Sequence, residues 1–247
     1  MSAIDRSASI QAKVKRADEH VRDLASEIRT FWNTPNRYAI APQRDPKTGD
    51  EVFYLNGNDL SPPPRWSIIV GDIVHNLRSA LDHLAWQLVL ANGGEVGRHI
   101  QFPIFEESHT VEEYEAKTAR MIKGSSDSAM RLVKGMHAYK GGECPALCLV
   151  HALNNVDKHR SLILMGVAVF DATTSYLFSL NDGAEILRIN PQNALNINTD
   201  LQRIFQIALH EPGIVEREPL IPCLRDLTKA VESTVETFFI TLPELSR

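Results

Sequence analysis

The chain has 247 residues, of which 43% are hydrophobic and 23% are charged, a composition typical of a globular protein with a substantial core. Its formal net charge of −5 argues against a protein that coats nucleic acid electrostatically, although a local basic groove is compatible with it. No apolar run is long enough for a membrane span, the N-terminus lacks the apolar core of a signal peptide, and three cysteines form no even disulfide framework, so we expect a cytoplasmic protein with no membrane partner.

Hydrophobic periodicity predicts a mainly helical chain. Apolar residues at helical spacing indicate a long amphipathic helix over 7–33, which Pro35 ends. Residues 37–55 are typical of a β-hairpin with its turn over 45–49. Further helices are predicted over 65–91, 110–122, 126–137, 145–159 and 222–240.

The pattern changes to that of strands after residue 161. Strands are predicted over 162–170, 175–180 and 184–189, with Asn181-Asp-Gly183 as a hairpin turn between the last two; the ambiguous segment 201–210 also fits a strand. The fold class is therefore α+β: a helical bundle, mainly over 7–33, 65–91, 110–160 and 222–240, with an antiparallel sheet over 161–210 and a small N-terminal hairpin. We expect one interleaved domain over 1–247.

The helix around 68–88 has an unusual polar face. At 100° per residue, one broad apolar stripe contains Val70, Ile73, Val74, Leu77, Leu81, Leu84, Ala85 and Leu88. The opposite face contains Asp72, His75, Ser79, His83 and Trp86, flanked by Asn76 and Asp82, and it lacks Lys and Glu. Solvated helix faces favour long charged side chains, so this face predicts a half-buried surface or a functional site.

Arg78 and His83 are separated by four residues on this helix. The spacing resembles the Arg-x(4–6)-His motif of the HEPN superfamily, helical-bundle proteins of which many are ribonucleases that need no metal. The resemblance implies a homodimer with two facing motifs, an RNA substrate, no cofactor, and an antitoxin partner where the protein acts in toxin or phage-defence systems. It also implies that His83 transfers a proton and that Arg78 holds the phosphate.

A structural interpretation of the same residues stays open. Arg78 and Asp82 are spaced for an exposed ion pair within one helix. His75, Ser79 and His83 could then form buried hydrogen bonds to a neighbouring helix. The function would be that of a non-catalytic module that binds a ligand or a protein.

The second candidate segment is His151–Arg160. His151, Asn154, Asn155 and Lys158 share one helical face, with Asp157 at its edge. The segment would form a second wall of the same site, with Lys158 and His159 binding phosphate; alternatively, its basic residues complement the dipole at a helix C-terminus. Together the segments resemble a widespread set of uncharacterised bacterial proteins with the signatures Gly-Asp-x-x-His-Asn-Leu-Arg-Ser-x-Leu-Asp-His and Asp-Lys-His-Arg.

Two further patterns bear on chemistry. Residues 117–140 are the one basic stretch, in which Arg120, Lys123, Arg131 and Lys134 either bind a polyanion or cover a solvated helix pair. A metal-dependent hydrolase is the other alternative, with ligands drawn from Asp72, His75, Asp82, His83, His151 and Asp157. Cys144, Cys148 and His151 could form a thiolate site, but their spacing is not that of a zinc knuckle.

Overall fold

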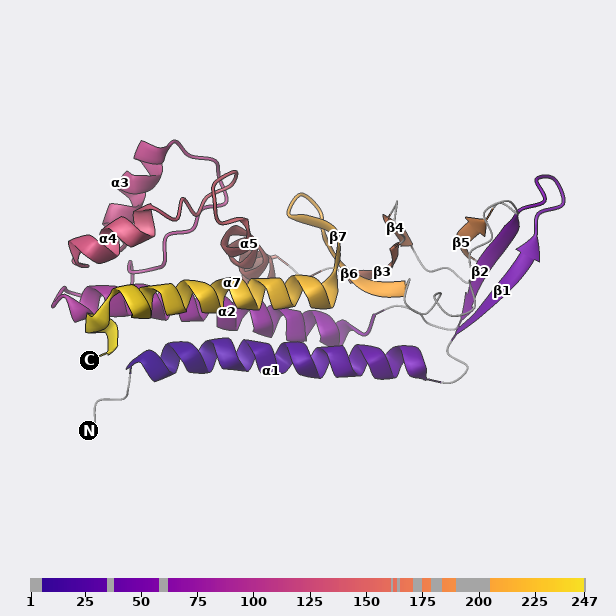
Figure 1. The fold of residues 1–247 in the computed structure, drawn as a ribbon, viewed down its shortest axis with the longest axis horizontal. Coiled ribbons are helices and arrows are strands. Elements are labelled where there is room, and N and C mark those ends of the chain that lie inside the picture. Colours follow the sequence, from indigo (N-terminus) through magenta and orange to yellow (C-terminus); the bar gives the residue numbers. More distant parts are fainter. Residues whose placement is uncertain are drawn as a thin grey trace. The chain divides into compact units, whose positions relative to one another are not determined.

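The computed structural model describes residues 6–34, 38–57, 62–160, 162–163, 165–170, 175–178, 184–189 and 205–246. Its helices are α1 (Arg6–Asn33), α2 (Pro64–Ala91), α3 (Val111–Met121), α4 (Asp127–Lys134), α5 (Pro145–His159) and α7 (Leu220–Thr241), followed by a 3-10 helix at Pro243–Ser246. Its strands are β1 (Tyr38–Arg44), β2 (Glu51–Gly57), β3 (Met165–Phe170), β4 (Ser175–Phe178), β5 (Ala184–Ile189), β6 (Phe205–Glu211) and β7 (Val215–Pro219). The predicted α+β fold with a helical bundle is confirmed (Figure 1).

Local sequence signals explain where the shorter helices begin and end. Thr110 accepts a hydrogen bond from the backbone N–H of Glu113, whose carboxylate accepts one from Thr110 in return, so α3 begins with a capping box. At the start of α4, the hydroxyl of Ser126 accepts a single capping hydrogen bond from the backbone N–H of Ala129. The helix predicted over 126–137 ends earlier, at Lys134, because the chain turns there and His137 adopts a left-handed φ of 47°.

The chain forms two compact units, each assembled from separate stretches of sequence. Unit 1 contains Met1–Arg22, Ile68–Leu162 and Leu224–Arg247, and unit 2 contains Asp23–Ser67 and Ile163–Cys223. The helices α1, α2 and α7 therefore each contribute residues to both units. The expectation of a single interleaved domain stays a prediction.

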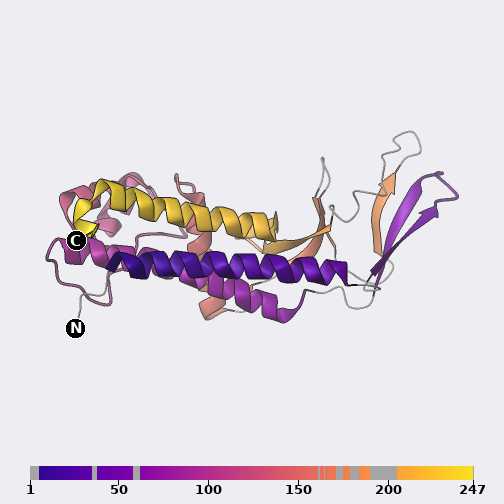
Figure 2. The same cartoon turned by 60° about the horizontal axis from the view of Figure 1, so that its bottom comes forward.

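The core of unit 1 lies among long helices. Every residue of the apolar stripe predicted for α2, from Val70 to Leu88, is at most 2% exposed. The helices α1, α2 and α7 run side by side in two views (Figures 1 and 2), and Ile10 of α1 and Val231 of α7 are fully buried. Each such aliphatic side chain stabilises the fold by about 1.5–3 kcal/mol relative to an exposed one.

Unit 2 contains two antiparallel sheets and the ends of three long helices, α1, α2 and α7. The sheet orders are β1-β2-β5 and β4-β3-β6-β7. The predicted N-terminal hairpin is present, with Gly49 at φ 76° in its turn, a conformation that favours glycine. In the helical part, Glu27 accepts hydrogen bonds from Arg65 at 2.9 Å and from the indole N–H of Trp66 at 3.0 Å.

The strand pairing differs from the sequence prediction at one strand. Strands β3, β4 and β6 do form an antiparallel sheet, but β5 pairs with β2, with Glu51 opposite Ile189. The predicted pairing of 175–180 with 184–189 is therefore wrong, and its turn at Asn181-Asp-Gly183 lies outside the described residues. A local turn signal does not determine which distant strand edge is available for pairing. The ambiguous segment 201–210 contains most of β6.

Candidate functional site

The helix α5 lies across α2, and the two meet at a glycine (Figures 1 and 2). A Cβ atom on residue 71 would overlap the carboxylate of Asp157, so glycine is what permits this close approach to the backbone of α2. The two segments that sequence analysis placed on opposite walls of one site, Gly71–His83 and Asp157–Arg160, thus meet here.

Arg78 is buried, with only 4% of its side chain exposed. Its Nη2 donates to Oδ1 of Asp82 at 2.7 Å and to the carbonyl oxygen of Phe102 at 2.9 Å. The same oxygen of Asp82 accepts a hydrogen bond from the backbone N–H of Phe102 at 3.0 Å. Burial lowers the pKa of Arg78, and the neighbouring Asp82 carboxylate opposes that effect. We call this closed set of contacts the Arg78 clamp; it ties the segment at Phe102 to α2.

His151 of α5 lies next to the Arg78 clamp. The pKa of His151 is lowered to about 4, first by burial and then by the positive charge of Arg78, while Glu106 and Asp82 oppose the shift. The imidazole is therefore neutral at neutral pH, and the amide Nδ2 of Asn155 lies 3.3 Å from its Nε2. Asn155 also donates to Glu106. Nδ1 of His151 and Nη1 of Arg78 are buried without a hydrogen-bond partner among the described residues.

His83 lies on the other side of α2, towards α1. Burial lowers its pKa, Lys13 lowers it further, and Asp82 has the opposite effect. Lys13 itself donates to Oδ1 of Asn76 at 3.2 Å. His83 is half-buried, so a neutral imidazole is partly accessible at this position.

Carboxylates and cations are mixed where α5 meets the start of α2. The pKa of Asp157 is raised, first by burial and then by the charge of Asp72. His75 and Lys158 act in the opposite direction. Lys158 and the next residue, His159, are exposed at the end of α5.

The polar face of α2 is a partly exposed stripe. We call it the α2 stripe; it consists of Ile68, Asp72, His75, Ser79, His83 and Trp86. Ile68 is 52% exposed and Trp86 is 38% exposed, so the stripe has an exposed large apolar side chain at each end. Asp72 and His75 are also exposed, whereas Ser79 is half-buried.

The predicted site residues therefore fall into two groups. Arg78, Asp82, His151 and Asn155 come together around the clamp, whereas His83 and Asn76 lie towards α1. Apart from these two groups, His75, Asp157 and Lys158 lie where α5 meets the start of α2. Sequence reasoning missed Glu106, Lys13 and the backbone of Phe102. Their roles follow from contacts between distant segments, for which the sequence contains no local signal.

Two residues of the basic stretch contact other residues of α3 and α4. Lys134 forms an ion pair with Glu115 at 3.1 Å, and Arg131 donates to the hydroxyl of Ser128 at 3.1 Å. Arg120 and Lys123 are exposed. These contacts are those expected of a solvated helix pair.

Within the described residues, no group of three or more His, Cys, Asp or Glu side chains is placed to hold a metal ion. Cys144 and Cys148 are free thiols, and burial raises the pKa of Cys148 to about 11, which disfavours the thiolate that binds metals.

No family model, curated protein or solved structure matches this chain. None of the helices in the described part of the chain is long and apolar enough to cross a membrane.

Proposed function

We propose that the protein is a non-catalytic binding module built on a helical bundle, in which the Arg78 clamp supports the scaffold. The observation that carries this proposal is the burial of the Arg78 guanidinium between Asp82 and the carbonyl of Phe102. An arginine that binds a phosphate must present free N–H donors to it. Here Nη2 already serves two oxygens, and Nη1, which has no hydrogen-bond partner among the described residues, is buried away from solvent.

The partner that best fits the α2 stripe is a second copy of the chain. The stripe is self-complementary about a two-fold axis between His75 and Ser79, as an isologous interface requires. In that arrangement Ile68 lies opposite Trp86 of the second copy, and Asp72 lies opposite its His83. His75 would lie opposite Ser79, so that apolar, charged and hydrogen-bonding positions each meet a suitable group.

The test is the mass of the full chain in solution. We expect a mass of twice 27.7 kDa by sedimentation equilibrium. Trp86→Glu would place an uncompensated charge in the interface and give the monomer. Val111→Glu is the matched control, since Val111 is 42% exposed on α3 outside the stripe. A monomeric wild type, or a Trp86→Glu variant that stays dimeric, would contradict the proposal.

One observation favours a second candidate, the metal-independent ribonuclease of a toxin or phage-defence system. His83 is partly accessible, and its lowered pKa keeps the imidazole neutral, as a proton acceptor for a ribose hydroxyl must be. The deciding assay is cleavage of RNA with EDTA present, comparing His83→Ala with the exposed control His99→Ala. If the wild type and His99→Ala cleave RNA and a folded His83→Ala variant does not, the protein is a nuclease and the proposal of a non-catalytic binding module is wrong.

A further inference from the structure

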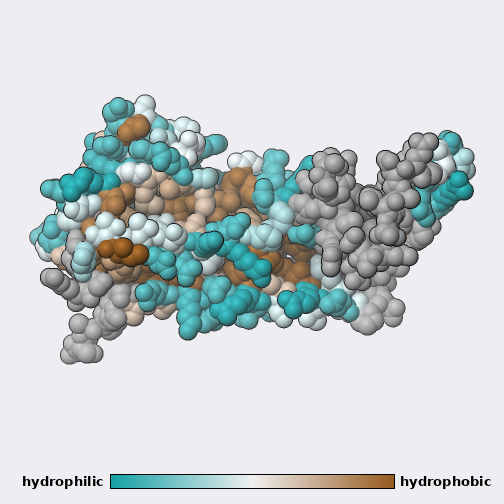
Figure 3. Space-filling model, in the orientation of Figure 1, coloured by the Kyte–Doolittle hydropathy of each residue, from teal (hydrophilic) through white to brown (hydrophobic). Residues whose placement is uncertain are grey.

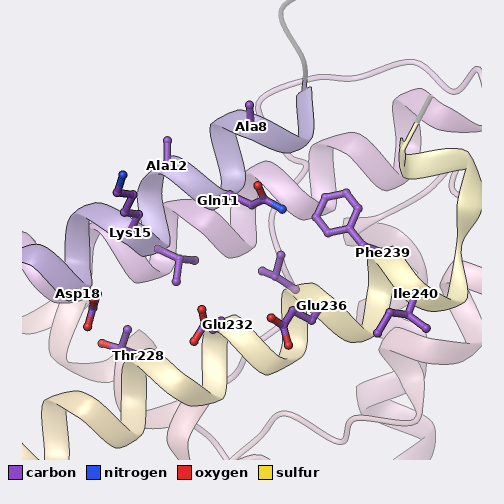
Figure 4. A pocket seen from close by; sticks show the side chains of 12 residues that line it. Ala8, Gln11, Ala12, Lys15, Asp18, Thr228, Glu232, Glu236, Phe239 and Ile240 are labelled. Carbon is purple, nitrogen blue, oxygen red and sulfur yellow. The ribbon is translucent and has the colours of Figure 1, made fainter.

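A groove separates α1 from α7 within unit 1, away from the α2 stripe. Its volume is about 960 Å³, and its lining comes from the two helices alone (Figure 4). Val14 and Val235 are its buried apolar lining, Phe239 is half-buried, and Ile240 is 81% exposed. On the face drawn in Figure 3, brown apolar patches lie between hydrophilic stripes over these helices. The groove therefore offers apolar surface to a ligand of helical dimensions.

The charged residues that line the groove are mostly acidic. They are Asp18, Glu232 and Glu236, with Lys15 as the one cation in the described lining. Asp18 is already paired with Arg22 at 2.6 Å. Glu232 and Glu236 of α7 both line the groove (Figure 4), and neither has a hydrogen-bond or ion-pair partner among the described residues.

Two exposed glutamates one turn apart repel each other. Such a like-charge pair costs about 0.2–0.5 kcal/mol in a helix, and a cation placed beside it removes that cost. Because Glu232 and Glu236 lie next to apolar residues, the groove combines an apolar surface with an unneutralised acidic edge. That combination is complementary to a helix with an apolar stripe and Lys or Arg beside it.

We propose that the α1–α7 groove binds an amphipathic helix of another polypeptide, whose apolar stripe packs on Val235, Phe239 and Ile240 and whose basic flank pairs with Glu232 and Glu236. Two other occupants fit the charge less well. The same groove of a second copy of the chain would bring further carboxylates to this edge, and an anionic lipid surface would be repelled by it. This site is independent of the dimer interface proposed above, because it uses different residues of different helices.

The probe is a fluorescein-labelled helical peptide of about 20 residues with leucines at helical spacing and lysines on both sides of them. We expect saturable binding to the full-length protein, with Kd on the order of 10 µM, by fluorescence anisotropy. Glu232→Lys/Glu236→Lys should weaken binding about tenfold or more, because the charges on this edge would then repel the peptide. Glu95→Lys/Glu107→Lys changes the net charge equally at exposed positions outside the groove and should bind like the wild type.

Three results would overturn the proposal. They are no binding of the peptide to the wild type, an equal loss of affinity in both charge-reversal variants, or equally tight binding of a control peptide that has glutamates in place of the lysines. A fourth result would be that the wild type is a dimer and that Ile240→Asp converts it to the monomer. The groove would then bind a second copy of this chain and not another polypeptide. The Trp86→Glu mass measurement reports on the α2 stripe separately, so either proposal can fail without the other.

Discussion

At the scale of single residues, the Arg78 clamp shows that the arginine of the Arg-x4-His motif has structural contacts within the fold. A guanidinium that is almost fully buried must keep its partners, because an unpaired charge in the interior is costly. Asp82 and the Phe102 carbonyl are those partners. The spacing of Arg78 and Asp82 predicts an exposed ion pair. In the structure the distant segment at Phe102 buries Arg78, so loss of the pair costs more stability than loss of an exposed one.

Removing the guanidinium should therefore destabilise the fold. We expect Arg78→Ala to lower the free energy of unfolding by about 3 kcal/mol in urea denaturation, because Asp82 and Phe102 lose their common partner. Arg120→Ala removes the same charge from an exposed position and should change it by less than about 0.5 kcal/mol. Equal effects of the two variants would show that the clamp contributes nothing particular to stability.

At the scale of elements, the meeting of α2 and α5 brings the two sequence signatures together. The spacing of polar residues on each helix predicted a shared site, but the contact depends on Gly71, whose missing side chain admits the Asp157 carboxylate. The glycine lies inside a long helix, where alanine would ordinarily be preferred. Its presence there is explained by the close approach of the two elements.

This contact predicts that the effect of Gly71→Ala on the free energy of unfolding changes sign when Asp157 is replaced by alanine. Gly71→Ala should destabilise the wild type, because the new Cβ forces the Asp157 carboxylate away. With Asp157→Ala already present, the same substitution should stabilise the protein by about 1 kcal/mol through helix propensity. Thermal and urea unfolding of the four proteins measures both effects, and simple additivity would mean that the two residues do not interact.

At the scale of the whole molecule, the chain is divided into two units but not into two consecutive segments. The helices α1, α2 and α7 each contribute residues to both units. A helix propagates cooperatively along its length, so loss of one unit should weaken helices that the other unit needs. Chain continuity therefore couples the stability of the two units.

We expect both units to unfold in a single transition. Trp86→Phe leaves Trp32 and Trp66 as fluorescent reporters, and both of these lie in unit 2, whereas far-UV circular dichroism is dominated by the helices. The two urea curves should coincide. Adding Arg78→Ala, a change in unit 1, should move both midpoints together; separate transitions would indicate independent units.

The sequence by itself determined the local structure. Periodicity, prolines and turn residues predicted the described α-helices, the N-terminal hairpin and the buried stripe of α2, because these depend on neighbours within a few residues. It also picked out the helices on which the candidate site lies. The roles of those residues were decided only by tertiary contacts: Phe102 buries Arg78, Glu106 approaches Asn155 beside His151, β5 pairs with β2, and α7 forms a groove with α1. Such contacts join residues far apart in the chain, and local pattern does not encode which distant surfaces meet.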